Sequence, residues 1–193
     1  MSIPLAIRAA FWIWFFAALF VGRFLLLQKF PPPAVQGVLL ALTAALVLTY
    51  RHAAAFRTWV DALDLRAIVL FHVTRFVGFY FVFLYRRGEL PYAFAVPGGI
   101  GDIIVAALAL VVALFSFGEA TRLHAIYIWN VIGFIDILLV VFSAVRIALA
   151  GGGRELIALT QLPLSLLPTF LVPLIIASHL AIFARLARAR AVT

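Results

Sequence analysis

Residues 66–87 read RAIVLFHVTRFVGFYFVFLYRR, and this stretch decides the fold class. It is almost entirely apolar and bracketed by arginines, which is typical of a bilayer-crossing helix, since about 20 apolar residues span the hydrocarbon core. His72 and Arg75 lie three residues apart inside it. Because charge is costly at this depth, we expect both side chains to face protein or a water-filled cavity rather than lipid.

The composition indicates a multi-span membrane protein. Of the 193 residues, 67% are hydrophobic and 11% are charged, whereas a soluble domain is roughly half apolar and a quarter charged. At about 20 residues for each crossing, the chain has room for about six or seven spans. We predict an all-α transmembrane bundle of about six helices that forms a single domain over residues 1–193.

Arginine carries almost all of the net charge of +8, and the arginines lie mainly at the ends of apolar runs. There they act as topology signals and contact phospholipid headgroups, so we expect the lipid bilayer as the partner and no nucleic acid. The chain has no cysteine, which excludes disulfides, iron–sulfur clusters, thiolate metal sites and thiol catalysis.

Helix breakers and polar clusters divide the apolar sequence into segments. The glycine- and proline-rich stretch 88–102 predicts an ordered outer loop, re-entrant or interfacial, and Asp102 at its end is expected to cap the next helix. The connector 51–66 suggests an interfacial helix with Trp59 in the headgroup zone. Pro168 and Pro173 are expected to kink the last helix. The six predicted spans cover residues 7–27, 34–50, 66–86, 101–117, 123–148 and 166–185.

An even number of spans places both ends of the chain on the same side of the membrane. The arginine-rich sequence ARLARAR at 184–190 favours the cytoplasmic side. We therefore predict a multi-pass protein of a bacterial inner membrane with both termini cytoplasmic.

Two histidines on different predicted spans lie at matching depth. His72 and His179 are each six residues from an arginine at the same membrane boundary, roughly 9 Å at the rise of an α-helix, and Asn130 is roughly 12 Å from it. Two imidazoles that face each other across a helix bundle can ligate the iron of a b-type haem. In that interpretation His72 and His179 are the metal ligands, and Arg75, Asn130 and Trp129 complete the cofactor site. The alternatives are a proton relay and a structural role, in which the histidines hydrogen-bond neighbouring helices.

Asp136 lies near the middle of the predicted span 123–148. Arg75 is its natural partner by charge, and a buried ion pair between them would neutralise both groups. Asp136 is either a proton carrier of a pump or transporter or one half of a structural ion pair.

The sequence Gly99–Ile100–Gly101–Asp102 resembles the GxGD motif of intramembrane aspartic proteases. That chemistry requires two carboxylates that share a proton and activate a water molecule, and Asp136 is the available partner of Asp102. In presenilin-like and prepilin-peptidase-like enzymes the partner aspartate precedes GxGD, whereas here it follows. The protease therefore ranks last among the alternatives.

Four stretches together resemble a group of small bacterial multi-span membrane proteins to which no activity is assigned. They are HVTR at 72–75 with Gly78, LPYAFAVPGGIGD at 90–102, WNVIGFID at 129–136, and LPTFLVP at 167–173 with His179. The resemblance covers about residues 66–185 and leaves out the first two spans. It implies about six helices, and it suggests that the polar residues His72, Arg75, Asp102, Asn130, Asp136 and His179 belong to one site.

The leading functional hypothesis is electron transfer by a bis-histidine haem b protein. The alternatives are a small-substrate or proton-coupled transporter or channel that uses the intramembrane polar residues, and an accessory subunit of a larger membrane complex. Association with other subunits or with further copies of the chain is consistent with each of these.

Overall fold

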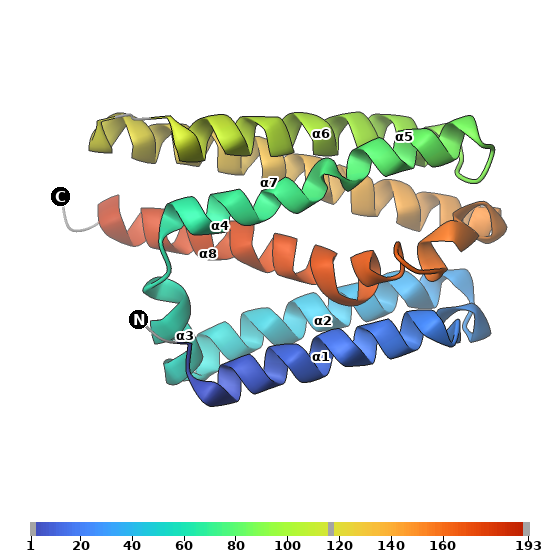
Figure 1. Cartoon of the computed structure of the whole chain (residues 1–193), viewed down its shortest axis with the longest axis horizontal. Coiled ribbons are helices and arrows are strands. Elements are labelled where there is room, and N and C mark those ends of the chain that lie inside the picture. The colour runs from blue at the N-terminus through green and yellow to red at the C-terminus, as the bar shows by residue number, and fades with distance from the viewer. Residues whose placement is uncertain (1–2, 116–117, 191–193) are drawn as a thin grey trace. The chain divides into compact units, whose positions relative to one another are not determined.

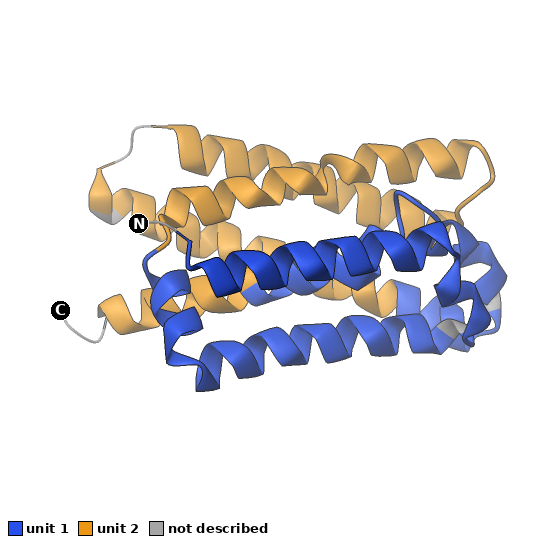
Figure 2. Ribbon diagram, turned by 60° about the horizontal axis from the view of Figure 1, so that its bottom comes forward, with its two compact units in different colours: residues 1–62, 144–177 blue, residues 63–143, 178–193 orange. Residues whose placement is uncertain are grey.

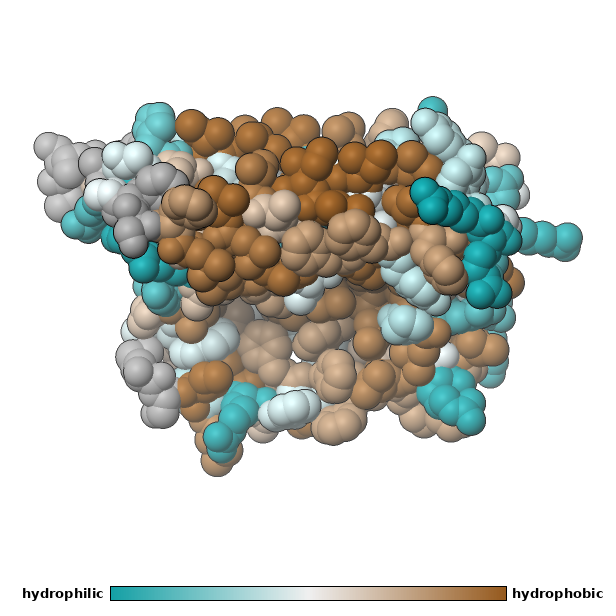
Figure 3. All heavy atoms as spheres, turned by 45° about the horizontal axis from the view of Figure 1, so that its top comes forward, coloured by the Kyte–Doolittle hydropathy of each residue, from teal (hydrophilic) through white to brown (hydrophobic). Residues whose placement is uncertain are grey.

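The computed structural model describes residues 3–115 and 118–190, and this part of the chain is all-α. Within it, six helices are long and apolar enough to cross a membrane (Figure 1). On the face that Figure 3 shows, hydrophobic residues fill most of the middle, and hydrophilic ones gather toward the two ends. The chain is thus a multi-span membrane protein, and the predicted fold class is confirmed.

The six membrane-spanning elements follow the predicted order with changed boundaries. The third predicted span is one continuous element made of α4, a 3₁₀ segment η2, and α5. The connector 51–66 contains a helix, α3, and its interfacial position stays a prediction. Residues 116–117, where the predicted span 101–117 ends, lie outside the described residues. The elements are α1 (Leu5–Arg23), η1 (Leu26–Lys29), α2 (Pro32–His52), α3 (Ala54–Asp61), α4 (Leu65–Phe71), η2 (His72–Val77), α5 (Gly78–Arg86), α6 (Tyr92–Leu114), α7 (Glu119–Leu149), η3 (Gly152–Thr160), η4 (Leu167–Leu171) and α8 (Val172–Arg190).

Two compact units make up the chain, and the chain passes between them after α3, within α7 and within α8 (Figure 2). Unit 1 contains residues 1–62 and 144–177, and unit 2 contains residues 63–143 and 178–193. The expectation of one transmembrane domain stays a prediction.

In unit 1, the π-helical segment η4 packs against α1 and α2. Pro173 has no N–H to donate to the carbonyl four residues earlier, that of Thr169. The indole Nε1 of Trp14 donates to this carbonyl at 2.8 Å, and the Trp14 ring packs on Phe170. The predicted distortion at Pro168 and Pro173 therefore takes the form of a π-helical turn and a side chain from α1 that satisfies a freed backbone group.

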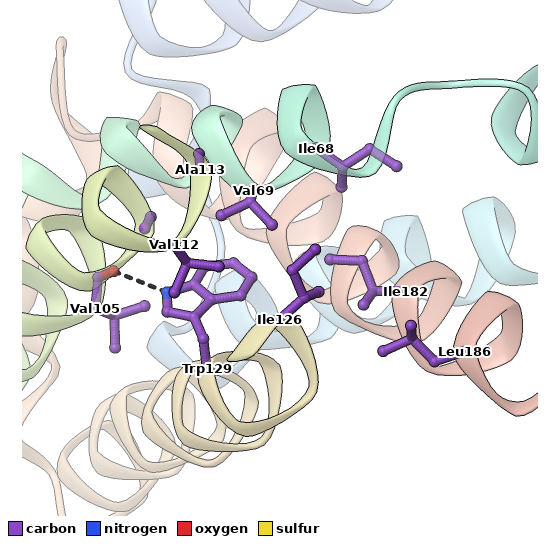
Figure 4. Close-up of a cluster of buried hydrophobic side chains, with 10 residues drawn as sticks. Ile68, Val69, Val105, Val112, Ala113, Ile126, Trp129, Ile182 and Leu186 are labelled. Carbon is purple, nitrogen blue, oxygen red and sulfur yellow. Dashed lines mark hydrogen bonds between the residues drawn. The ribbon is translucent and has the colours of Figure 1, made fainter. Parts of the chain in front are cut away.

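In unit 2, the element α4–η2–α5 packs along α6 (Figure 1). A buried apolar cluster joins α4, α6, α7 and α8, and Trp129 lies in it with its Nε1 donating to the Val105 carbonyl at 3.0 Å (Figure 4). The start of α4 is fixed by Asp64, whose carboxylate accepts a hydrogen bond from the backbone N–H of Arg66. This cap explains why the span begins within one residue of its predicted start.

The predicted ordered loop at 88–102 is wrong in extent, because α6 already begins at Tyr92. Pro91 precedes the helix, and Pro97 lies inside it, where it leaves the Ala93 carbonyl without its helical donor. Ser143 on α7 supplies that donor, since its Oγ donates to Ala93 O at 2.9 Å. A proline within a span is tolerated when a neighbouring helix satisfies the freed carbonyl.

The glycines of this stretch serve close helix contacts and not a turn. A Cβ on Gly99 would meet the backbone of Gly78, one on Gly98 would lie 3.3 Å from Val140, and one on Gly101 would collide with the carboxylate of Asp136. Small residues allow helix backbones to approach closely in membranes. The same composition that predicts a loop is therefore consistent with a tightly packed helix.

We expect Ser143 and Pro97 to be energetically coupled. Ser143→Ala should lower the free energy of unfolding by about 1 kcal/mol, because it leaves the Ala93 carbonyl without a partner. In a Pro97→Ala background residue 97 regains its N–H, so the same change should cost close to nothing. A double-mutant cycle of unfolding in detergent micelles measures the coupling, and equal costs in both backgrounds would contradict it.

Candidate functional site

Three charged side chains from three helices meet in unit 2. We refer to Arg75 of η2, Asp102 of α6 and Asp136 of α7 as the ion triad. Arg75 Nε donates to Asp102 Oδ1 at 2.6 Å, Nη2 donates to Asp136 Oδ2, and Nη1 donates to the Gly133 carbonyl at 2.9 Å. The Arg75 side chain is 1% exposed, so a buried guanidinium is held by two carboxylates and one backbone oxygen.

The ion triad lies at the middle of its three spans. Arg75, Asp102 and Asp136 each lie within about one residue of the midpoint of the candidate spans Leu65–Arg86, Tyr92–Leu114 and Thr121–Leu149. The expectation that Asp102 caps a helix near the boundary is wrong, because α6 begins ten residues before it. Arg75 pairs with Asp136, the partner that its charge predicts. Asp102 is a second partner, which the sequence did not predict.

The local winding of η2 aligns His72 with Arg75. A 3₁₀ helix has three residues per turn, so side chains at i and i+3 lie directly above one another. Both residues are buried. A 3₁₀ stretch inside a longer helix often marks a functional hinge or a strained sequence, and here it places two buried polar side chains one above the other.

The two histidines form a contact that we call the imidazole pair. The rings of His72 and His179 lie 4.3 Å apart between centroids, and neither residue is exposed. The Trp129 ring contacts both, at 4.8 Å from His72 and 5.5 Å from His179. The predicted juxtaposition of these histidines is therefore present, together with the predicted neighbour Trp129.

Asn130 holds His179 at two points. Its Nδ2 donates to the backbone carbonyl of His179 at 3.1 Å, and its Oδ1 lies 2.8 Å from Nδ1 of the same histidine. Because the first bond fixes which end of the amide is the oxygen, Nδ1 of His179 must be the donor to Oδ1. A neutral His179 then has a bare lone pair on Nε2.

One ring nitrogen of each histidine has no hydrogen-bond partner among the described residues: Nδ1 of His72 and Nε2 of His179. The other nitrogen of His72, Nε2, lies 3.0 Å from the Ser178 hydroxyl. Buried polar atoms are nearly always paired, so each exception requires an explanation. Ser178 was not identified from the sequence, although it directly precedes His179.

Gly133 connects the imidazole pair to the ion triad. Its carbonyl accepts from Arg75, and a Cβ at this position would lie 2.8 Å from Cε1 and 3.2 Å from Nε2 of His179. The absent side chain makes the space that the His179 ring occupies. All six polar residues that the resemblance assigns to one site thus lie in unit 2, whereas His52 and His124 are exposed.

The distances within the site can be compared with what haem ligation, metal binding and aspartic-protease chemistry each require. Metal–nitrogen bonds are about 2.0 Å long, so imidazoles on opposite faces of an iron have ring centres well over 4 Å apart. The imidazole pair would have to separate to hold a haem. Within the described residues no group of three or more histidine, aspartate or glutamate side chains could hold a metal ion. Asp102 and Asp136 are each hydrogen-bonded to Arg75, whereas an aspartic protease needs two carboxylates that share a proton.

A family model described as "Domain of unknown function (DUF8737)" matches residues 32–187, so the chain belongs to this family. The match includes α2, which the resemblance at 66–185 leaves out. No curated protein and no solved structure matches the chain.

Proposed function

We propose that this member of the DUF8737 family carries protons across the membrane, with Asp136 as the proton carrier and Arg75 as its fixed counter-charge. The observation that carries the proposal is the ion triad itself, a buried arginine between two carboxylates at mid-span. Ionisable groups inside a membrane are costly, and they mark proton relays and ion pathways.

The net charge of the ion triad allows it to bind one proton. Arginine stays protonated in proteins, so two carboxylates against one guanidinium leave one net negative charge when both are ionised. A single proton on one carboxylate neutralises the group. Because buried net charge is disfavoured, uptake and release of one proton is the reaction that this arrangement supports.

Asp136 is the better carrier of the two carboxylates. Its side chain is 19% exposed, against 5% for Asp102. Asp102 is enclosed and accepts from Arg75 Nε, which orients the guanidinium. A carrier must exchange its proton with the outside, and the more accessible carboxylate suits that role.

Asp136→Asn should abolish proton flux while the protein still folds, because the amide can accept from Arg75 but cannot exchange a proton. Flux is measured in liposomes that contain a pH-sensitive dye, with an outward potassium-diffusion potential that makes the lumen negative and drives proton entry. Glu155→Gln, which removes an exposed carboxylate, is the matched control and should keep the wild-type rate. Wild-type liposomes that acidify no faster than empty ones would refute proton transport.

The haem b electron-transfer hypothesis stays a prediction with its own measurement. An absorption spectrum of protein made with ample haem, oxidised and then reduced, would give a Soret band that His72→Ala or His179→Ala removes. A colourless protein with proton flux favours the relay. Co-purification with other membrane proteins in mild detergent tests the accessory-subunit alternative.

A further inference from the structure

We infer that the imidazole pair is a second proton-binding station, which receives the proton of Asp136 at Nε2 of His179. The inference rests on the proposed function and adds a site to it. It explains why two buried ring nitrogens have no partner among the described residues: one is the atom that takes up the proton, and the other is the atom that receives it next.

The Asn130 contact prepares His179 as a base. Because Oδ1 of Asn130 accepts from Nδ1, the proton of neutral His179 is on Nδ1 and the lone pair is on Nε2. A proton that binds Nε2 makes an imidazolium whose Nδ1–H remains donated to Asn130. Protonation therefore costs no existing hydrogen bond, which is the condition for a reversible proton acceptor.

The charges that surround the imidazole pair balance the transferred proton. The groups on the neighbouring elements are Arg75 on η2, Asp102 on α6 and Asp136 on α7, with one net negative charge when both carboxylates are ionised. That charge is neutralised equally by a proton on Asp136 or by an imidazolium at His179. Moving the proton between these positions leaves the site without net charge, so the step avoids the cost of a buried unpaired ion.

Transfer within the imidazole pair completes the sequence. The proton leaves Nε2 of His179 and binds Nδ1 of His72, so that His179 returns to its neutral form and His72 becomes the imidazolium. The ring centroids are 4.3 Å apart, so the transfer takes place between two rings in direct contact. The other nitrogen of His72, Nε2, lies 3.0 Å from the hydroxyl of Ser178.

Nitrogen-15 NMR of histidine-labelled protein tests the tautomer directly. The chain has four histidines, and a His52→Gln/His124→Gln variant leaves only the imidazole pair. We expect one ring of neutral histidine with a protonated Nδ1 and a bare Nε2, the less common tautomer of free histidine, and we expect Asn130→Leu to remove it. Detection of only the Nε2–H tautomer would overturn the inference. Both buried histidines are intact in the labelled protein, so this experiment does not depend on the folding of an active-site variant.

Proton flux separates this inference from the proposed function. His179→Gln should reduce flux in the liposome assay about 100-fold or more, the scale of a lost general base. The exposed-histidine variant His52→Gln/His124→Gln should keep the wild-type rate. Loss of flux in Asp136→Asn but not in His179→Gln would overturn the second station and leave the carrier in place. Absence of flux in the wild type would overturn both.

Discussion

Arg75→Leu should lower the free energy of unfolding by about 3–5 kcal/mol, the cost of removing one partner from a buried ion pair. The variant leaves two carboxylates at mid-span with no counter-charge, and it also deprives the Gly133 carbonyl of its donor. Equilibrium unfolding in mixed micelles with increasing denaturing detergent measures the effect. Arg86→Leu, which removes an exposed arginine from the end of the same span, is the matched control and should change stability by about 0.5 kcal/mol or less.

Removal of the carboxylates should reverse most of this loss. In Arg75→Leu/Asp102→Leu/Asp136→Leu no charge remains in the group, and apolar replacement of buried ion pairs is often neutral or stabilising. We expect the triple variant to be more stable than Arg75→Leu and to lack proton flux. A triple variant less stable than the single one would mean that the unpaired carboxylates are not what destabilises Arg75→Leu.

Gly78→Ala should destabilise the protein by about 1–3 kcal/mol, the usual cost of overpacking. A Cβ at Gly78 would collide with the carbonyl oxygen of Gly99, and neither backbone can move without shifting a whole helix. Thermal unfolding in detergent measures the change. Since Gly78 directly follows η2, we also expect a weakened hold of Arg75 on Asp102 and a lower proton flux.

Gly37→Ala provides the matched control for this substitution. Gly37 lies within α2, and a Cβ there would meet nothing within 4 Å. Alanine is the better helix former by about 1 kcal/mol, so this change should be neutral or stabilising. Equal losses at both positions would mean that the close approach of Gly78 and Gly99 is not what limits substitution.

The sequence predicts the spans well because length and hydropathy alone define most of them. It fails at the start of α6, where Pro91, Pro97 and the glycines have the composition of a loop. The helix persists because Ser143, 46 positions after Pro97 in the sequence, satisfies the freed carbonyl, and no local pattern could reveal that contact. The position of Asp102 within α6 depends on where the helix begins. Because the predicted start was nine residues too late, the prediction placed Asp102 at the end of a helix instead of in its middle.

The residues of the candidate site stand out in the sequence because they are polar groups inside apolar runs. Their pairing was only partly predictable. Charge selected Asp136 for Arg75, but the second partner depended on the boundary of α6. The role of Gly133 and the orientation of Asn130 depend on which helices are neighbours, and hydrophobic periodicity does not determine that order.

The 3₁₀ winding of η2 affects the direction in which every third side chain of this span points. Every third residue from 69 to 84 is buried: Val69, His72, Arg75, Gly78, Phe81 and Leu84. In an unbroken α-helix such a row turns away by about 60° at each step, so its five steps would carry the last residue most of the way around the helix. Two of the steps fall in η2, where three residues complete a turn and the row does not rotate. The other three steps turn the row by about 180°, so the 3₁₀ segment lowers the total rotation from about 300° to about 180°. The buried row therefore stays closer to one face of the span than it would in an unbroken α-helix.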